Sequence, residues 1–187
     1  MKQTQEFQVT PASPADAGRI SDFVAGLSVR TQFLRFFASV ARPSSSLLRA
    51  LTGARGRTDV LIATDDRGAV IGHAMAADRT ADDGRHLSDL GLVVADGWQG
   101  RGVGSALMTA LAERAAGRGT DELVMDVLPG NTRMLAIAGR RWPGAPREYN
   151  ADSVTIRARL NQPAYRDQVA RTDQPARLDR PAAASAA

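Results

Sequence analysis

The sequence contains no cysteine, only two histidines and a single lysine. Without cysteine, the chain has neither a disulfide framework nor a thiolate metal site, and His73 and His86 alone are too few for a structural zinc site. No apolar run is long enough to span a bilayer, and the polar N-terminus lacks the apolar segment of a signal peptide. We therefore expect a cytoplasmic protein with no bound metal and no membrane association.

The scarcity of lysine makes arginine almost the entire basic complement, since Lys2 is the only lysine among 24 basic residues. GC-rich coding explains such a bias, and so does an anionic partner, because the guanidinium fork matches phosphate and carboxylate. The arginines are spread along the chain, and aromatic residues make up only 5% of it, which is poor for stacking on bases. The composition therefore gives no support for binding nucleic acid, although the net charge is +4.

The length and composition fit one globular domain followed by a tail. The chain has 187 residues, of which 43% are apolar, enough for a single core. After Asn161 it becomes rich in Pro, Arg, Asp and Ala and loses apolar periodicity. We predict one domain over residues 1–160 and a disordered C-terminal tail over residues 161–187.

Periodicity and breaker residues predict a mixture of strands and helices. Strands are expected at 6–10, 58–64, 69–78, 87–95, 121–129 and 153–160, and helices at 14–27, 31–41, 44–53, 102–117 and 131–141. In the first helix one apolar face is formed by Ile20, Phe23, Val24 and Leu27. This order favours an α/β (α+β) fold with a mixed, mainly antiparallel central sheet flanked by helices.

A glycine-rich loop, WQGRGVGSAL at residues 98–107, joins an apolar strand to a helix. Such a loop exposes several backbone N–H groups at the helix N-terminus, where the helix dipole favours an anion such as phosphate or pyrophosphate. The alternative is a tight turn that needs glycine for its positive φ angles. The spacing differs from the dinucleotide pattern G-x-G-x-x-G, and the lysine of a Walker loop is missing.

The stretch Q-G-R-G-V-G at residues 99–104 resembles the Gln/Arg-x-x-Gly-x-Gly/Ala signature of the GNAT superfamily of N-acetyltransferases. The flanks LGLVVADGW and SALMTALAERAAGRG are also similar to that family. The stretch VLPGNTRMLAIAGRR resembles the bacterial protein-acetyltransferase version of the domain, and LSVRTQFLRFF resembles its substrate-side helices. The resemblance covers residues 5–160 and implies the GNAT fold.

This resemblance implies that the chain transfers acetyl from acetyl-CoA, its co-substrate, directly to a primary amine, either a protein lysine or a small molecule. By position, the pyrophosphate would be held by Gln99, Gly100, Arg101, Gly102, Val103, Gly104 and Ser105. The pantetheine arm would pair with the backbone of Leu92, Val93 and Val94. Asn131 would lie beside that arm, or serve only as a helix N-cap. Phosphates are also within the expected reach of Arg101, Arg133 and Arg140, unless these are ordinary surface arginines.

Two catalytic roles follow from the same resemblance. The N–H of Val94 matches the backbone donor that stabilises the oxyanion, and Asp89 occupies the position of a glutamate that acts as general base in the protein-acetyltransferase relatives. Asp89 lies in an otherwise apolar run, which leaves two interpretations: a carboxyl whose pKa is raised by burial, or a solvent-facing residue at the start of the strand. Ala138 occupies the position of a tyrosine that protonates the thiolate in many members.

Other residues receive more ordinary interpretations. We expect His73 to be structural and Phe33, Phe36 and Phe37 to belong to the core, although these phenylalanines could also form a wall of the acceptor site. The acidic loop containing Asp78, Asp82 and Asp83 is expected to be a solvated surface rather than an attractor of amines. The assembly is expected to be a monomer or a homodimer. A non-catalytic acyl-CoA-binding sensor or partner domain remains the alternative function.

Overall fold

The structure is a computed structural model that describes residues 7–54 and 56–160. Its main elements are β1 (Gln8–Pro11), α1 (Ala17–Ala25), α2 (Val29–Phe36), α3 (Ser45–Leu51), β2 (Thr58–Thr64), β3 (Val70–Thr80), β4 (His86–Val94), α4 (Val103–Gly117), β5 (Glu122–Val127), α5 (Thr132–Arg141), β6 (Arg147–Tyr149) and β7 (Val154–Arg159). Short 3₁₀ turns are formed by Pro14–Asp16 and Asp96–Trp98. The predicted tail, residues 161–187, lies outside the described residues.

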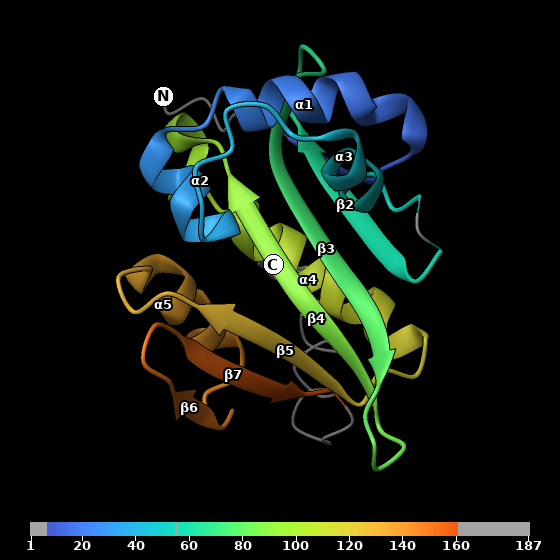
Figure 1. The fold of residues 1–187 in the computed structure, drawn as a ribbon, viewed down its shortest axis with the longest axis vertical. Coiled ribbons are helices and arrows are strands. Elements are labelled where there is room, and N and C mark those ends of the chain that lie inside the picture. Colours follow the sequence, from blue (N-terminus) through green and yellow to red (C-terminus); the bar gives the residue numbers. More distant parts are fainter. Residues whose placement is uncertain (1–6, 55, 161–187) are drawn as a thin grey trace, which may run out of the picture.

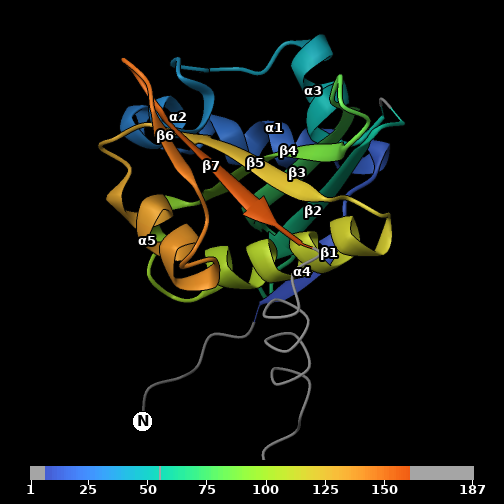
Figure 2. The same cartoon turned by 90° about the horizontal axis from the view of Figure 1, so that it is seen from below.

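One seven-stranded sheet runs in the order β1-β2-β3-β4-β5-β7-β6, and every pair is antiparallel except β4 with β5 (Figure 1). Helices α1, α2 and α3 lie on one face, and α4 and α5 lie on the other (Figure 2). The predicted mixed, mainly antiparallel sheet with flanking helices is confirmed. The short edge strand β6 was not predicted, because its three exposed residues carry no apolar alternation.

The helices on the two faces cover separate apolar clusters. The larger cluster lies under α4, and the helix contributes to it Val103, Leu107, Met108, Leu111, Ala112 and Ala115. Under α1–α3 a smaller cluster contains Ile20, Phe23, Val24 and Leu27, as their helical spacing predicts. The sheet is therefore packed on both sides, which holds its central strands in place.

Two helix boundaries differ from the prediction for local reasons. The first helix begins with a 3₁₀ turn, in which the carboxylate of Asp16 accepts hydrogen bonds from the N–H and hydroxyl of Ser13. The second helix begins at Val29, because the hydroxyl of Ser28 caps it by accepting a bond from the N–H of Thr31 (3.2 Å). It ends at Phe37, which adopts a left-handed φ of 59°. This earlier end leaves α2 beside the last part of β4.

Strands β4 and β5 pair only over Leu87–Asp89 and then diverge (Figure 1). Beyond that point β4 continues to pair with β3 on its other side. The N–H of Ala95 donates to the carbonyl of Ile71 on β3 (2.8 Å). Because antiparallel residues alternate in direction, the N–H groups of Leu92 and Val94 face away from β3, toward the divergence. The middle of the sheet thus contains a short edge with no strand partner.

Candidate active site

Two adjoining cavities lie where β4 and β5 diverge. The first, of about 290 Å³, is bordered by the end of β4, the glycine loop, α2 and the start of α5. The second, of about 310 Å³, lies between α2, β4 and β5. Five residues line both cavities: Leu34, Arg35, Leu92, Asn131 and Met134. The two cavities therefore meet beside the partnerless edge of β4.

The glycine loop has the geometry expected both of a tight turn and of an anion site. Gly100 and Gly102 have left-handed φ angles of 80° and 90°, and a Cβ on either would meet nothing within 4 Å. No side chain among the described residues caps the N-terminus of α4, which begins just after Gly102. The loop therefore presents helix N–H groups to open space, an arrangement that binds anions.

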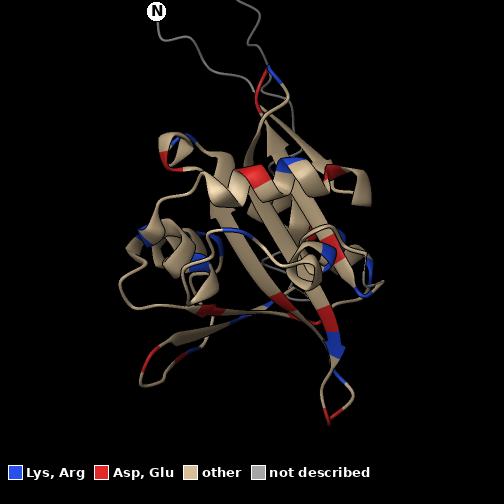
Figure 3. Ribbon diagram, turned by 45° about the horizontal axis from the view of Figure 1, so that its top comes forward, with Lys and Arg blue, Asp and Glu red and all other residues tan. Residues whose placement is uncertain are grey.

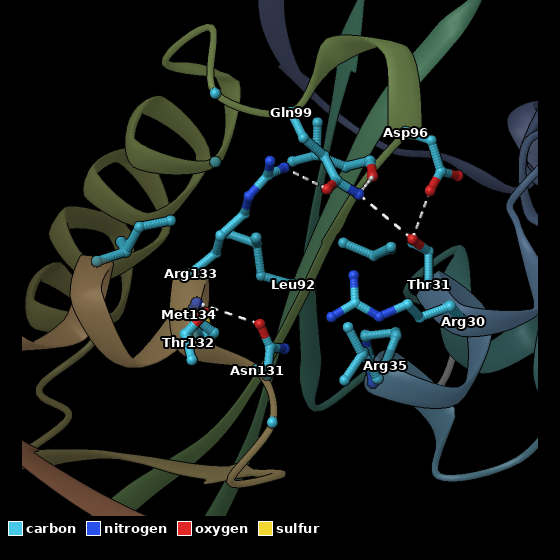
Figure 4. A pocket seen from close by; sticks show the side chains of 17 residues that line it. Arg30, Thr31, Arg35, Leu92, Asp96, Gln99, Asn131, Thr132, Arg133 and Met134 are labelled. Carbon is cyan, nitrogen blue, oxygen red and sulfur yellow. Dashed lines mark hydrogen bonds between the residues drawn. The ribbon is translucent and has the colours of Figure 1, made fainter.

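The side chain of Gln99 joins three elements around the first cavity (Figure 4). Its Nε2 donates to the carbonyl of Val94 (3.1 Å) and to the hydroxyl of Thr31 (3.3 Å). Its Oε1 accepts a bond from Nη1 of Arg133 (2.5 Å). Gln99 thereby fixes the end of β4 against α2 and α5, a positioning role that its place in the motif did not indicate.

Asp96 fixes α2 to the loop. Its carboxylate accepts bonds from the N–H of Ser28 (2.9 Å), the hydroxyl of Ser28 (2.8 Å) and the hydroxyl of Thr31 (2.7 Å). Partial burial opposes the ionisation of Asp96, but these donated hydrogen bonds outweigh it and lower the pKa of the carboxyl below its usual value. The wall formed by α2 is thus held by an ionised side chain.

The structure brings only some of the predicted cofactor residues to the first cavity. Its lining includes Leu92, Val93, Val94, Gln99, Gly100, Gly104 and Asn131, but not Arg101, Gly102, Val103 or Ser105. Of the candidate phosphate-binding arginines, Arg133 lines the cavity and Arg140 does not, while the guanidinium of Arg101 lies 5.2 Å from the ring of Trp98. Asn131 does cap α5, since its Oδ1 accepts a bond from the N–H of Met134 (3.2 Å).

Asp89 lines the second cavity, and its surroundings match the solvent-facing interpretation rather than the buried one. Its side chain is 50% exposed, and both carboxylate oxygens accept bonds from Nε of Arg79 (3.0 and 2.9 Å). Asp89 pairs with Ala77 on β3, so Arg79, two residues further along that strand, lies on the same face of the sheet. The apolar neighbours in the sequence point to the other face or lie further along β4.

Three residues at the second cavity were not identified from the sequence. Asp126 on β5 accepts a bond from the hydroxyl of Thr155 (2.6 Å), and alternation places it on the same face as Asp89. The guanidinium of Arg35 lies flat on the backbone of Gly91, where a Cβ would be only 2.3 Å from Nη2. The alternation of β5 carried a signal for Asp126, whereas nothing local indicated that α2 crosses β4 at Gly91.

The remaining candidates divide between confirmation and correction. His73 is structural, because it is buried and its Nε2 donates to the carbonyl of Leu51 (2.8 Å). Burial, reinforced by the nearby charge of Arg35, lowers the pKa of His73 to about 4 despite this bond. The core assignment is wrong for Phe33 and Phe37, which are 50% and 43% exposed. Their side of α2 faces outward, and the second cavity is lined by Phe36 and Phe37.

Charged residues are scattered over the ribbon rather than gathered on one element (Figure 3). In the predicted acidic loop, Asp83 is paired with Arg85 (2.8 Å), and Asp78, at its edge, is paired with Arg118 (3.1 Å). Over residues 7–54 and 56–160, no group of acids and histidines could hold a metal ion, and no helix could cross a membrane. No tyrosine from the same ranges lines either cavity, and Ala138 is buried.

Comparison with known proteins identifies one family. The model of the "Acetyltransferase (GNAT) family" matches residues 29–141. The GNAT domain of S. lividans PAT is 24% identical, with a TM-score of 0.73, over 86% of this chain and 99% of that one. The putative acetyltransferase yncA from Salmonella typhimurium, solved with acetyl-CoA, is 19% identical (TM-score 0.66; 84% and 95% covered). A phosphinothricin acetyltransferase from Sinorhizobium meliloti, also with AcCoA, is 21% identical (TM-score 0.62; 81% and 85% covered). Among curated proteins no match was found.

Proposed function

The chain belongs to the GNAT acetyltransferase family, and from this premise we propose that it transfers the acetyl group of acetyl-CoA directly to a primary amine. The observation that carries the proposal is the partnerless edge of β4, which ends at the glycine-bearing N-terminus of α4. An extended amide chain ending in a pyrophosphate matches that combination of a strand edge and a helix N-terminus. We propose residues 1–160 as one acetyltransferase domain.

The residues at the first cavity fit acetyl-CoA. The open space above Gly100 and Gly102 leaves room for phosphate close to the backbone. The N–H and C=O groups of Leu92 face the divergence, where they can pair with the amides of pantetheine, whereas those of Val93 face β3. Arg133 and Arg30 also line this cavity and supply positive charge for phosphates.

Bound acetyl-CoA would supply a thioester as the acyl donor. The N–H of Val94 points into the divergence and is placed to donate to an oxygen that gains negative charge. Asp89 would accept the proton of the amine. A water molecule would carry the proton, because the carboxylate is exposed to solvent and its position is fixed by the pair with Arg79. With no tyrosine at either cavity among the described residues, water would protonate the leaving thiolate.

The acceptor is a primary amine that enters the second cavity. Among the neighbouring structures named above, one is named for phosphinothricin, and the names of the other two specify no acceptor. Protein lysine and small amines are therefore both compatible with the family. The lining of the second cavity, described in the next subsection, favours the small molecule.

The test is a calorimetric titration with acetyl-CoA, using NAD as the negative control. Gly102→Trp should abolish binding, because the indole would fill the open space above the loop. Gly102→Ala is the matched control, since it carries the same left-handed strain at φ 90° without the bulk and should retain most of the affinity. Failure of the wild-type protein to bind acetyl-CoA would refute the proposal.

A non-catalytic acyl-CoA sensor is the second candidate. The observation in its favour is that the proposed base, Asp89, is paired with Arg79 while no tyrosine among the described residues lines the cavities. An enzyme releases free CoA thiol when a suitable amine is present, and Asp89→Asn suppresses that release without loss of cofactor binding. A sensor binds acetyl-CoA with similar affinity and releases no thiol with any acceptor.

A further inference from the structure

The guanidinium of Arg35 is charged and has no acidic partner within the described part of the chain. Its Nε is buried without a hydrogen bond, and its Cζ lies 5.1 Å from the centre of the Phe36 ring. No carboxylate or carbonyl of residues 7–54 and 56–160 accepts a bond from it. The side chain belongs to α2 and lines both cavities, the first of which is drawn in Figure 4.

Such a group is unfavourable unless something else pairs with it. A partly buried charge without a partner destabilises the folded chain, and within residues 7–54 and 56–160 other arginines do pair with acids, among them Arg19, Arg79, Arg85, Arg114, Arg118 and Arg159. Burial lowers the pKa of Arg35 only to about 10, so the guanidinium remains charged at neutral pH. An anion that enters the cavity would supply the missing partner.

Gly91 provides independent evidence that the fold accommodates the guanidinium of Arg35 at this place. The guanidinium lies on the backbone of β4 so closely that a Cβ at Gly91 would be 2.3 Å from Nη2 and 2.4 Å from Cζ. Gly91 has no left-handed φ that would require glycine. The close approach of Arg35 therefore explains why this position has no side chain. Strand and helix are thus shaped to place a cation between the proposed acyl donor and acceptor.

The rest of the second cavity complements a small molecule with three distinct parts. Asp126 lines it, and its one recorded bond is to the neutral hydroxyl of Thr155, so its charge is available to an ammonium group. Leu34, Phe36 and Met134 provide apolar wall between the charged groups. A cation, an acid and an apolar surface in one cavity match a carboxylate, an amine and an apolar side chain.

We infer that the acceptor is a small amine that also carries a carboxylate and an apolar side chain, as an amino acid does, and that Arg35 binds the carboxylate. This inference rests on the proposed acetyl transfer for the fate of the amine, but not for its binding. An acceptor with positive charge alone, such as a polyamine or the ammonium end of a protein lysine, could pair with Asp126 but would leave Arg35 without a partner.

Equilibrium binding tests the inference without turnover. L-leucine, L-methionine and L-phenylalanine are titrated calorimetrically against the protein saturated with CoA, each beside its neutral amide. At least one acid should bind about tenfold or more tightly than its amide, because the amide leaves the guanidinium unpaired. If all three amides bind as well as their acids, or none of the six compounds binds, the inference is wrong.

Variants identify the group responsible. Arg35→Gln should remove the preference for the acid, and Gly91→Ala should reduce it with Arg35 still present, because the new methyl group displaces the guanidinium. Arg49→Gln is the matched control: it removes one positive charge from the neighbouring helix α3 and lines neither cavity, so the preference should persist. Circular dichroism and thermal unfolding verify that each variant is folded.

The outcomes separate this inference from the proposed function. If Arg35→Gln weakens acetyl-CoA binding and leaves the acid preference intact, Arg35 serves the cofactor and the inference is overturned while acetyl transfer stands. If an acid binds through Arg35 but no thiol is ever released, the carboxylate site stands and acetyl transfer fails. Release of thiol with a lysine peptide, faster than with any of the three acids, also overturns the inference.

Discussion

The two faces of the sheet are packed in different ways. Beneath α4 the apolar cluster is the larger one and extends along the helix from Val103 to Ala115, and the buried hydroxyls of Ser88 and Thr120, beyond the end of the helix, hydrogen-bond to each other (3.0 Å). Beneath α1–α3 the cluster is smaller and lies on the same side of the sheet as the buried side chains of Gln32 and His73 and the half-buried side chain of Arg35. One face stabilises the domain, whereas the other combines stability with the placement of charge.

The three polar side chains differ in how completely they are satisfied. Gln32 donates to the carbonyls of Val24 and Leu27 and accepts a bond from the N–H of Val40. His73 makes one bond and leaves Nδ1 without a partner, and Arg35 makes none with the described residues. Of the three, only Arg35 lines the cavities, so the side chain with no hydrogen bond is the one that a ligand can reach.

The largest expected effect comes from substituting Asp89, the proposed base, whose side chain lies on the α1–α3 face of the sheet. Asp89→Asn should lower kcat by about 10²- to 10⁴-fold, the usual contribution of general base catalysis, with unchanged affinity for acetyl-CoA. Single-turnover thiol release and calorimetry provide the two measurements. Asp82→Asn, in the neighbouring loop, is the control. A kcat within twofold of wild type would exclude Asp89 as the base.

The second test uses pH to address the buried histidine. The folded-state pKa of His73 is about 4 and the unfolded value is about 6.5, so the unfolded chain binds more protons between them. Stability should therefore be complete above about pH 6.5 and fall as the pH decreases toward 4, by about 3 kcal/mol. Urea unfolding across this range measures the slope. His73→Leu should flatten it, and His86→Gln, at an exposed site, should not.

The third test fills space on the α4 side. A Cβ at Gly104 would make ordinary contacts of 3.5–3.6 Å with Ile137, Leu92 and Val94, and a longer side chain would extend into the first cavity. Gly104→Leu should raise the Kd for acetyl-CoA about 100-fold, equivalent to about 2.7 kcal/mol. Gly104→Ala, which fits the available space, should bind nearly normally. Equal effects of the two substitutions would contradict this account.

The smallest expected effect is the loss of stability when one helix cap on each face is replaced by alanine. Asn131 caps α5 and Ser44 caps α3, and in each the side-chain oxygen accepts one backbone N–H bond of 3.2 Å. Each alanine variant should lose about 1 kcal/mol of stability, measured by thermal unfolding. Only Asn131→Ala should also change acetyl-CoA affinity, because Asn131 lines the first cavity. Unchanged affinity would leave Asn131 as a cap alone.

The sequence predicted the α4 side of the site much better than the α2 side. The loop at Gly100 and Gly102 needs positive φ and lies between a strand and a helix, so local spacing is informative. Residues of α2, β4 and β5 meet at the second cavity through tertiary packing, which no local pattern encodes. The sequence left the burial of Asp89 open, because its cross-strand partner Arg79 lies ten residues away in the chain. Most elements of the fold were predicted because strand alternation and helical periodicity were strong over those lengths.

The edge of β4 in the middle of the sheet has a consequence for hydrogen exchange. The amide protons of Gly91 and Val93 point to β3 and are held in its ladder, whereas those of Leu92 and Val94 point into the divergence. Neighbouring amides of a single strand should therefore exchange with deuterium at very different rates, fast and slow in alternation. A ligand lying along this edge would slow the fast set alone, so each of these protons becomes a reporter of occupancy at its own residue.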